Sequence, residues 1–211
     1  MNVEAQAHSG VVVVPMTEDT VAAAARIHLQ VLPGSRTALM GLAYVRSWVD
    51  WFRRPEHQGV AFAAITAEGE VVGYVIGAPL GYPTELSRDL FWPSIAAFAA
   101  RPWLILMPQF RHGVFGRLRL TVWGTLPREA GFQLPAPTMS LVAMGVSPAF
   151  RRARVGHRLL DESERRAVGM NMRSMHLSTE SDNMTAQQFY ERYGWRPLSK
   201  SADKVHYGRI L

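Results

Sequence analysis

Residues 141–195 read LVAMGVSPAF RRARVGHRLL DESERRAVGM NMRSMHLSTE SDNMTAQQFY ERYGW, and this stretch decides the fold. Its order is an apolar strand, an arginine cluster that contains a glycine, a helix, a second strand and an aromatic-rich helix. The first strand, residues 139–146, is apolar almost throughout, which indicates burial on both faces of a sheet. The helix at 156–170 places Leu159, Leu160, Ser163 and Ala167 on its inner face.

The arginine-rich turn at residues 146–156 is a candidate phosphate-binding site. Backbone N–H groups at the start of a helix lack partners and, together with the helix dipole, favour an anion. Gly156 has no Cβ, so a ligand can approach the backbone closely. Guanidinium groups pair well with phosphates, and four surround the turn, namely Arg151, Arg152, Arg154 and Arg158. The alternative is an ordinary strand-to-helix turn with a solvated basic face, because P-loop and Rossmann fingerprints are both absent.

The rest of the chain alternates strand and helix signals around this stretch. We expect strands at 11–14, 60–65, 71–76, 174–179 and 204–210, and helices at 18–32, 42–52 and 185–193. Glu68-Gly69 predicts a hairpin turn between the second and third strands. The order is strand, two helices, hairpin, insertion, strand, helix, strand, helix, strand. It predicts an α/β fold with a mixed central sheet flanked by helices.

Residues 79–138 are expected to form a helical insertion between the third and fourth strands of a single domain, residues 1–211. Within the insertion, residues 91–110 contain Arg101 as the only formal charge. A membrane-spanning helix needs about 20 apolar residues, but three prolines and the central arginine argue against one continuous helix. We therefore expect two short helices split near Pro102, packed on the protein; contact with a membrane surface is possible but not favoured.

Composition narrows the class of protein. The chain has 211 residues, 48% of them apolar, which is enough for one well-buried core. It has no cysteine, which excludes disulfides and an acyl group carried on a thiol. The net charge of +6 favours an anionic partner, but no nucleic-acid motif accompanies it. The histidines are scattered and predict no metal site. The N-terminus lacks the pattern of a signal peptide, so we expect a cytoplasmic protein.

Two motifs in the deciding stretch resemble those of the GCN5-related N-acetyltransferase (GNAT) superfamily. The first is Arg/Gln-x-x-Gly-x-Gly/Ala, which stands here as RRARVG at residues 151–156 and continues into the helix as HRLL. The second is Asn-x-x-Ala-x-x-aromatic-Tyr-x-x-x-Gly-aromatic, which stands as NMTAQQFYERYGW at residues 183–195. The two motifs come in the family's order, separated by one strand. The resemblance implies a GNAT-like fold that uses acetyl-CoA as acyl donor.

The resemblance also implies which residues contact acetyl-CoA. They come from the strand end, the turn and the last helix: Met144, Gly145, Val146, Arg151, Arg152, Ala153, Arg154, Val155, Gly156, His157, Asn183, Ala186 and Tyr190. The backbone of residues 143–146 is expected to polarise the thioester carbonyl, as similar enzymes do. Arg154 departs from the pattern, since the family has a glycine there. An arginine keeps its backbone N–H, so the phosphate contact survives if its backbone angles are ordinary.

Tyr190 is the candidate general acid. It occupies the position where the family places this group, and a phenol can donate a proton to the departing sulfur. The alternative is a core position, because Tyr190 belongs to an i, i+3, i+4, i+7 stripe with Ala186, Phe189 and Tyr193.

The candidate general base is Glu180, at the end of the strand expected at 174–179. Many relatives carry a glutamate on the preceding strand, but residues 139–146 contain no carboxylate. His176, Ser178 and Glu180 alternate along the strand and so share one face. That face could equally be turned to solvent.

Together these features predict an N-acetyltransferase that moves an acetyl group from acetyl-CoA directly to a primary amine of a small molecule. Residues 32–52 are similar to the acceptor-side helices of family members that act on small amines, including amino sugars and natural-product amines. The aromatic residues of the insertion can line an acceptor cleft or pack onto the sheet. Two alternatives stand: a protein or peptide N-acetyltransferase, and a non-catalytic CoA-binding or membrane-associated module. Monomer and homodimer are both open.

Overall fold

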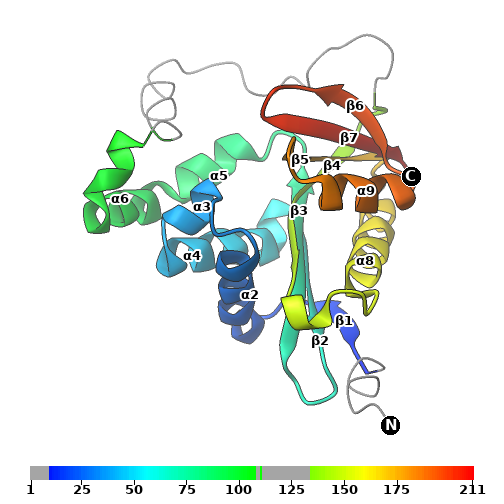
Figure 1. The fold of residues 1–211 in the computed structure, drawn as a ribbon, viewed down its shortest axis with the longest axis horizontal. Coiled ribbons are helices and arrows are strands. Elements are labelled where there is room, and N and C mark those ends of the chain that lie inside the picture. The colour runs from blue at the N-terminus through cyan, green and yellow to red at the C-terminus, as the bar shows by residue number, and fades with distance from the viewer. Residues whose placement is uncertain (1–9, 108–109, 111–133) are drawn as a thin grey trace.

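Seven strands of the described residues form one mixed sheet, which confirms the fold class predicted from the sequence. The computed structural model describes residues 10–107, 110 and 134–211 (Figure 1). The sheet order is β1-β2-β3-β4-β5-β7-β6; β4 and β5 run parallel, and the other neighbours pair antiparallel. The strands are β1 (Val12–Pro15), β2 (Val60–Ile65), β3 (Val71–Pro79), β4 (Thr138–Val146), β5 (Ser174–Glu180), β6 (Arg196–Lys200) and β7 (Lys204–Ile210).

Helices cover both faces of this sheet (Figure 1). One face carries α2 (Glu18–Val31) and α4 (Leu42–Arg53), with the short segments α3 (Arg36–Leu39) and η1 (Pro55–His57) beside them. The opposite face carries α8 (Val155–Gly169) and α9 (Met184–Arg192). The four helices predicted from apolar periodicity are thus all present.

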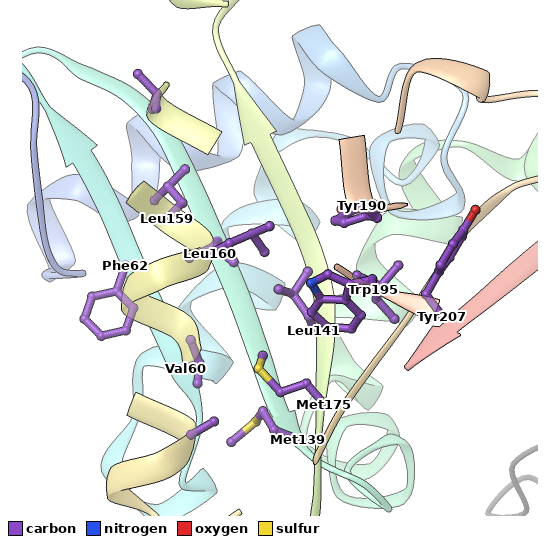
Figure 2. Close-up of a cluster of buried hydrophobic side chains, with 14 of the residues drawn as sticks. Val60, Phe62, Met139, Leu141, Leu159, Leu160, Met175, Tyr190, Trp195 and Tyr207 are labelled. Carbon is purple, nitrogen blue, oxygen red and sulfur yellow. The ribbon is translucent and has the colours of Figure 1, made fainter. Parts of the chain in front are cut away.

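The core under α8 and α9 holds the deciding stretch together (Figure 2). The predicted inner face of α8 is fully closed, since Leu159, Leu160, Ser163 and Ala167 are each 0% exposed. These side chains meet apolar residues of β4 and β5, among them Met139, Leu141 and Met175. In this part of β4 and β5, the odd-numbered residues therefore face α8 and α9. The even-numbered residues face the other side of the sheet.

Strands β4 and β5 pair over a short distance and then part. Their register covers three rungs, Thr138 with Ser174, Met139 with Met175 and Ser140 with His176. Beyond Ser140, β4 continues to Val146 while it pairs with β3 alone. The register with β3 shifts between Ile76 and Gly77, where Ile76 faces Ala143 and Gly77 faces Leu141, so Val142 is the extra residue of a bulge. The edge of β4 that faces β5 is therefore open from the bulge onward.

The described part of the insertion is helical, as predicted. It contains α5 (Pro83–Asp89), α6 (Phe91–Ala100) and the 3-10 segment η2 (Pro102–Leu106), so the chain does divide at Arg101 and Pro102. The Arg101 guanidinium donates to the carbonyl of Met40 at 3.1 Å, which fixes the insertion to the α3–α4 corner. Its outer side remains apolar and exposed, with Trp92 at 75% and Leu106 at 77%. In the described part of the chain, no helix combines the length and the apolar character needed to cross a membrane.

α3 and β6 were not predicted from the sequence. α3 is only four residues long and starts from Ser35, whose hydroxyl accepts the N–H of Ala38. β6 reads RPLSK, without apolar alternation, and contains a proline. It pairs with β7 alone at the end of the sheet order, which is where a strand with Pro197 is tolerated.

Replacing Gly145 by alanine is expected to destabilise the protein by about 1–3 kcal/mol, the usual cost of overpacking. A Cβ there would lie 2.7 Å from Cε1 of Tyr74 and 2.8 Å from Cγ2 of Val31. The matched control is Gly169→Ala at the end of α8, where a Cβ would have no neighbour within 4 Å. Urea unfolding measures both. A Gly145→Ala variant as stable as the control would contradict the close packing of Tyr74 over β4.

Candidate active site

The arginine-rich turn lies where the open edge of β4 ends. The 3-10 turn η3 (Pro148–Phe150) leads from β4 to Arg151. α8 then begins at Val155 with Arg154 as its N-cap residue, and no side chain caps it. The N–H groups of the first turn therefore have no intrahelical acceptor and lie at the positive end of the helix dipole. The structure thus gives the turn the helix start that phosphate binding requires.

The backbone of this turn is left-handed at two arginines. Arg154 has φ 56° and ψ 16°, and Arg152 has φ 74°. The condition of ordinary backbone angles, under which the phosphate contact at Arg154 would survive, is therefore not met. The left-handed conformation costs a residue with a Cβ roughly 1–2 kcal/mol, and glycine adopts it freely. Arg154 thus adopts the conformation that a glycine would take at this position.

All four arginines around the turn are exposed, Arg158 included. Arg158 differs from the prediction, because its guanidinium donates to the carbonyl of Val11 and joins α8 to the residue before β1. The Arg158 guanidinium is thus directed to the N-terminal segment, and the other three guanidinium groups, those of Arg151, Arg152 and Arg154, flank the turn.

The two sequence motifs touch each other. A Cβ on Gly156 would lie 3.3 Å from Cζ of Phe189 and 4.0 Å from Cε of Met144. His157 packs edge-on against the Phe189 ring, with centroids 5.1 Å apart. The absence of a side chain at Gly156 therefore has a second use besides ligand approach. It lets Phe189 of α9 pack closely against the start of α8. This contact brings residues of the strand, the turn and the last helix together, as the resemblance implied.

Asn183 caps α9. Its Oδ1 accepts the N–H of Ala186 at 3.1 Å. The capped end of α9 is also tied to β5, because the carbonyl of Glu180 accepts from Gln187 Nε2 at 3.3 Å. α9 thus has a fixed position relative to the strand that parts from β4.

Tyr190 is buried on the α8 and α9 side of the sheet. It is 8% exposed and packs against Trp195 and Tyr207, with ring centroids 6.0 and 6.1 Å away (Figure 2). Burial raises the pKa of Tyr190 to about 12, so its phenol carries a proton at neutral pH. The core position considered from the sequence is confirmed, and a protonated phenol here can still donate.

Glu180 lies at the far end of β5, away from the rungs shared with β4. The residue is exposed, and its register partner across the sheet is Lys204 of β7. Its role as base stays a prediction.

Comparison with known proteins agrees with this geometry. The model of the acetyltransferase (GNAT) family matches residues 21–195. The chain belongs to the GNAT acetyltransferase family. Among solved structures, SsHAT superposes with a TM-score of 0.60 at 18% identity, covering 95% of this chain and 98% of its own. Ard1 from Thermoplasma volcanium gives 0.58 at 17% identity, with 96% and 98% covered.

A third structure was solved with a ligand. The PaiA N-acetyltransferase of Thermoplasma acidophilum, in complex with coenzyme A, gives a TM-score of 0.52 at 10% identity, covering 95% of this chain and 99% of that one. At these identities the likeness establishes the GNAT fold. GNAT acetyltransferases are acyltransferases that use acetyl-CoA, and the acceptor differs among them.

A buried polar pair in this GNAT chain was not singled out from the sequence. Tyr74 of β3 and His28 of α2 are 0% and 1% exposed, and Tyr74 Oη lies 2.5 Å from His28 Nδ1. His28 Nε2 is 2.7 Å from the hydroxyl of Thr37. Burial lowers the pKa of His28 to about 4. Burial and, second, the Tyr190 phenol raise the pKa of Tyr74.

Replacing Arg154 by glycine is expected to stabilise the folded protein by about 1 kcal/mol, because glycine adopts the left-handed conformation without strain. The matched control is Arg151→Gly, whose φ of −62° suits any residue. There the added chain flexibility is expected to cost about 0.5–1 kcal/mol. Thermal and urea unfolding measure both changes. Equal destabilisation by the two substitutions would contradict the left-handed backbone at Arg154.

Proposed function

We propose that this protein transfers the acetyl group of acetyl-CoA directly to a primary amine of a small molecule. One observation supports the proposal: the open edge of β4 leads to an uncapped, arginine-flanked helix start, and the helix that touches this start carries the buried, protonated Tyr190. These are the two requirements of acyl transfer from a CoA thioester, an anion site for the carrier and a proton for the leaving sulfur.

The donor side is built mainly from backbone. The first-turn N–H groups of α8, at Val155, Gly156 and His157, receive the pyrophosphate, with the exposed arginines of the turn around it. The pantetheine arm then follows the open edge of β4 from Val146 to the bulge at Val142. At roughly 3.3 Å per residue this edge is about 13 Å long, and it holds an extended arm. Asn183 and Ala186 at the start of α9 form the opposite wall.

The transfer needs no acyl-enzyme. The attacking amine forms a bond to the thioester carbon, and open N–H groups on the edge of β4 stabilise the oxygen as it gains charge. The carbon–sulfur bond then breaks, and Tyr190 donates its phenolic proton to the departing sulfur. The amine nitrogen must lose a proton in turn. Glu180 is the base proposed from the sequence, and from its exposed position it works through water.

A panel of amines tests the proposed function. Purified protein is incubated with acetyl-CoA and amino sugars, polyamines, aromatic amines or short peptides with free N-termini, and CoA release is followed. We expect release with at least one small amine, together with a mass increase of one acetyl group on that amine. Release with peptides alone would assign a protein or peptide acceptor. Acetyl-CoA binding without release on any amine would favour the non-catalytic module.

Replacing Tyr190 by phenylalanine is expected to lower kcat by about 100-fold or more, the usual contribution of general acid catalysis. The dissociation constant for acetyl-CoA should change little, because the ring remains in its packing. The control is Tyr207→Phe, which removes a neighbouring phenol that donates to Glu191 at 2.8 Å. That variant should keep kcat within about threefold of wild type, a difference below about 1 kcal/mol. Equal kcat values for the two variants would remove Tyr190 from the chemistry.

A further inference from the structure

The outer surface of the insertion between residues 91 and 106 consists of apolar residues alone, and we call it the outer patch. On α6 its members recur at helical spacing, so they form one stripe along the helix. The two polar residues in this range, Ser94 and Arg101, are buried and half-buried. The ten exposed residues are Phe91, Trp92, Ile95, Ala96, Ala99 and Ala100 of α6, and Pro102, Trp103, Ile105 and Leu106 of η2.

The inner side of α6 and η2 already has its packing partner. The buried cluster of Met40, Ala97, Leu104 and Phe110 joins this side to the α3–α4 corner. The Arg101 guanidinium, which donates to the carbonyl of Met40, fastens the insertion to the same corner. A rotation of α6 that buried the outer patch would expose this cluster instead. The outer patch is therefore a fixed feature of the surface.

The outer patch is large for the surface of a single protein. Its six large side chains, 47% to 77% exposed, are those of Phe91, Trp92, Ile95, Trp103, Ile105 and Leu106. With about 200 Å² for a large side chain in full, these fractions amount to roughly 700 Å². The largest apolar patch on a typical monomer covers about 300–600 Å², and larger patches mark contact sites. Apart from Ser94, α6 is also apolar on every side, which is typical of helices with neighbours all round.

The outer patch is accessible to a large partner and is already ordered. α6 lies beside α3 and α4 at one end of the molecule, on the opposite side from α8 (Figure 1). The rings of Phe91 and Trp92 meet edge to face, with centroids 5.3 Å apart and planes at 77°. A partner can therefore cover the outer patch without approaching the arginine-rich turn.

Charge indicates which kind of partner the outer patch fits. The patch carries no charge, and Arg88 and Asp89, just before it, pair with each other at 3.1 Å. Helices that lie on a membrane surface carry Lys or Arg on a polar face, and attraction to anionic lipids adds to their binding. α6 contains neither residue type and has no polar face. A second copy of this chain presents the same uncharged surface, so two outer patches can cover each other without burying a charge.

The size of the outer patch fits a dimer as well. A stable interface buries about 800 Å² on each partner, and the patch supplies most of that area. Two-fold dimers are the commonest oligomers, and their interface uses the same surface on both subunits. We infer that the outer patch is a two-fold interface between two copies of this chain, in which α6 and η2 of one protomer cover those of its partner. The inference is independent of the proposed function.

Measurement of the mass in solution over a dilution series tests the inference. Light scattering after gel filtration should give twice the 23.6 kDa of the chain. Trp92→Glu combined with Leu106→Glu puts four like charges into the interface, and we expect the dissociation constant of the dimer to rise by about 100-fold or more. The matched control is Val168→Glu on α8, where a 55% exposed apolar side chain lies outside the patch and the dimer should persist. Circular dichroism checks that each variant is folded.

A single thiol locates the interface. The chain has no cysteine, so Ala96→Cys provides one attachment point for a spin label and leaves the large side chains of the patch in place. A two-fold dimer holds the label twice, and we expect a shorter distance between the two labels for Ala96→Cys than for Val168→Cys. Loss of the dimer on labelling Ala96→Cys alone would equally place the interface at the patch.

Four results would overturn the inference. They are a wild-type monomer at every concentration, a dimer that the double glutamate variant leaves intact, a dimer that Val168→Glu disrupts to the same extent, and a shorter label distance for Val168→Cys than for Ala96→Cys. Wild-type monomer that sediments with vesicles of phosphatidylcholine and phosphatidylglycerol would assign the outer patch to a lipid surface instead.

Discussion

The parting of β4 from β5 is the constraint on which the rest of the candidate site depends. Three rungs of parallel pairing hold the two strands together, and the bulge at Val142 then turns β4 while it stays bonded to β3. An open strand edge inside a protein is costly unless a ligand or water satisfies its backbone groups. Here α8 starts at the far end of that edge without a side-chain cap. The unpaired N–H groups of the β4 edge are therefore followed directly by those of the first turn of α8. The backbone therefore provides a long binding surface that suits a phosphorylated, amide-containing carrier.

Packing against this edge explains side chains that look unrelated in the sequence. Gly145 is small because the ring of Tyr74 and the end of α2 lie against it. Gly156 is small because Phe189 of α9 does the same at the start of α8. The two glycines let one helix from each face reach the strand edge. The end of β4 and the start of α8 are thus bordered by aromatic rings, Tyr74 from one face and Phe189 from the other.

Local sequence signals predicted most of the fold and the donor half of the site. The inner face of α8 depends on residues a few positions apart, so sequence alone reveals it. The conformation of Arg154 could not be predicted, because the turn forces left-handed angles on whatever residue stands there. His176 Nε2 lies 3.2 Å from Nδ1 of His206, a contact that depends on the register of two strands 30 residues apart, which no local pattern encodes.

Sites made from backbone groups and sites made from side chains respond differently to substitution. A donor site made from backbone N–H groups tolerates substitution, and an arginine at a glycine-type position keeps the helix start intact. The opposite face is made from side chains of α2, α4 and β5, so each substitution there alters shape or charge. If the donor enters from the α8 and α9 face and the amine from the other, the two specificities are set by separate parts of the chain. The acceptor would then be decided by α2, α4 and the insertion, while the carrier stays the same.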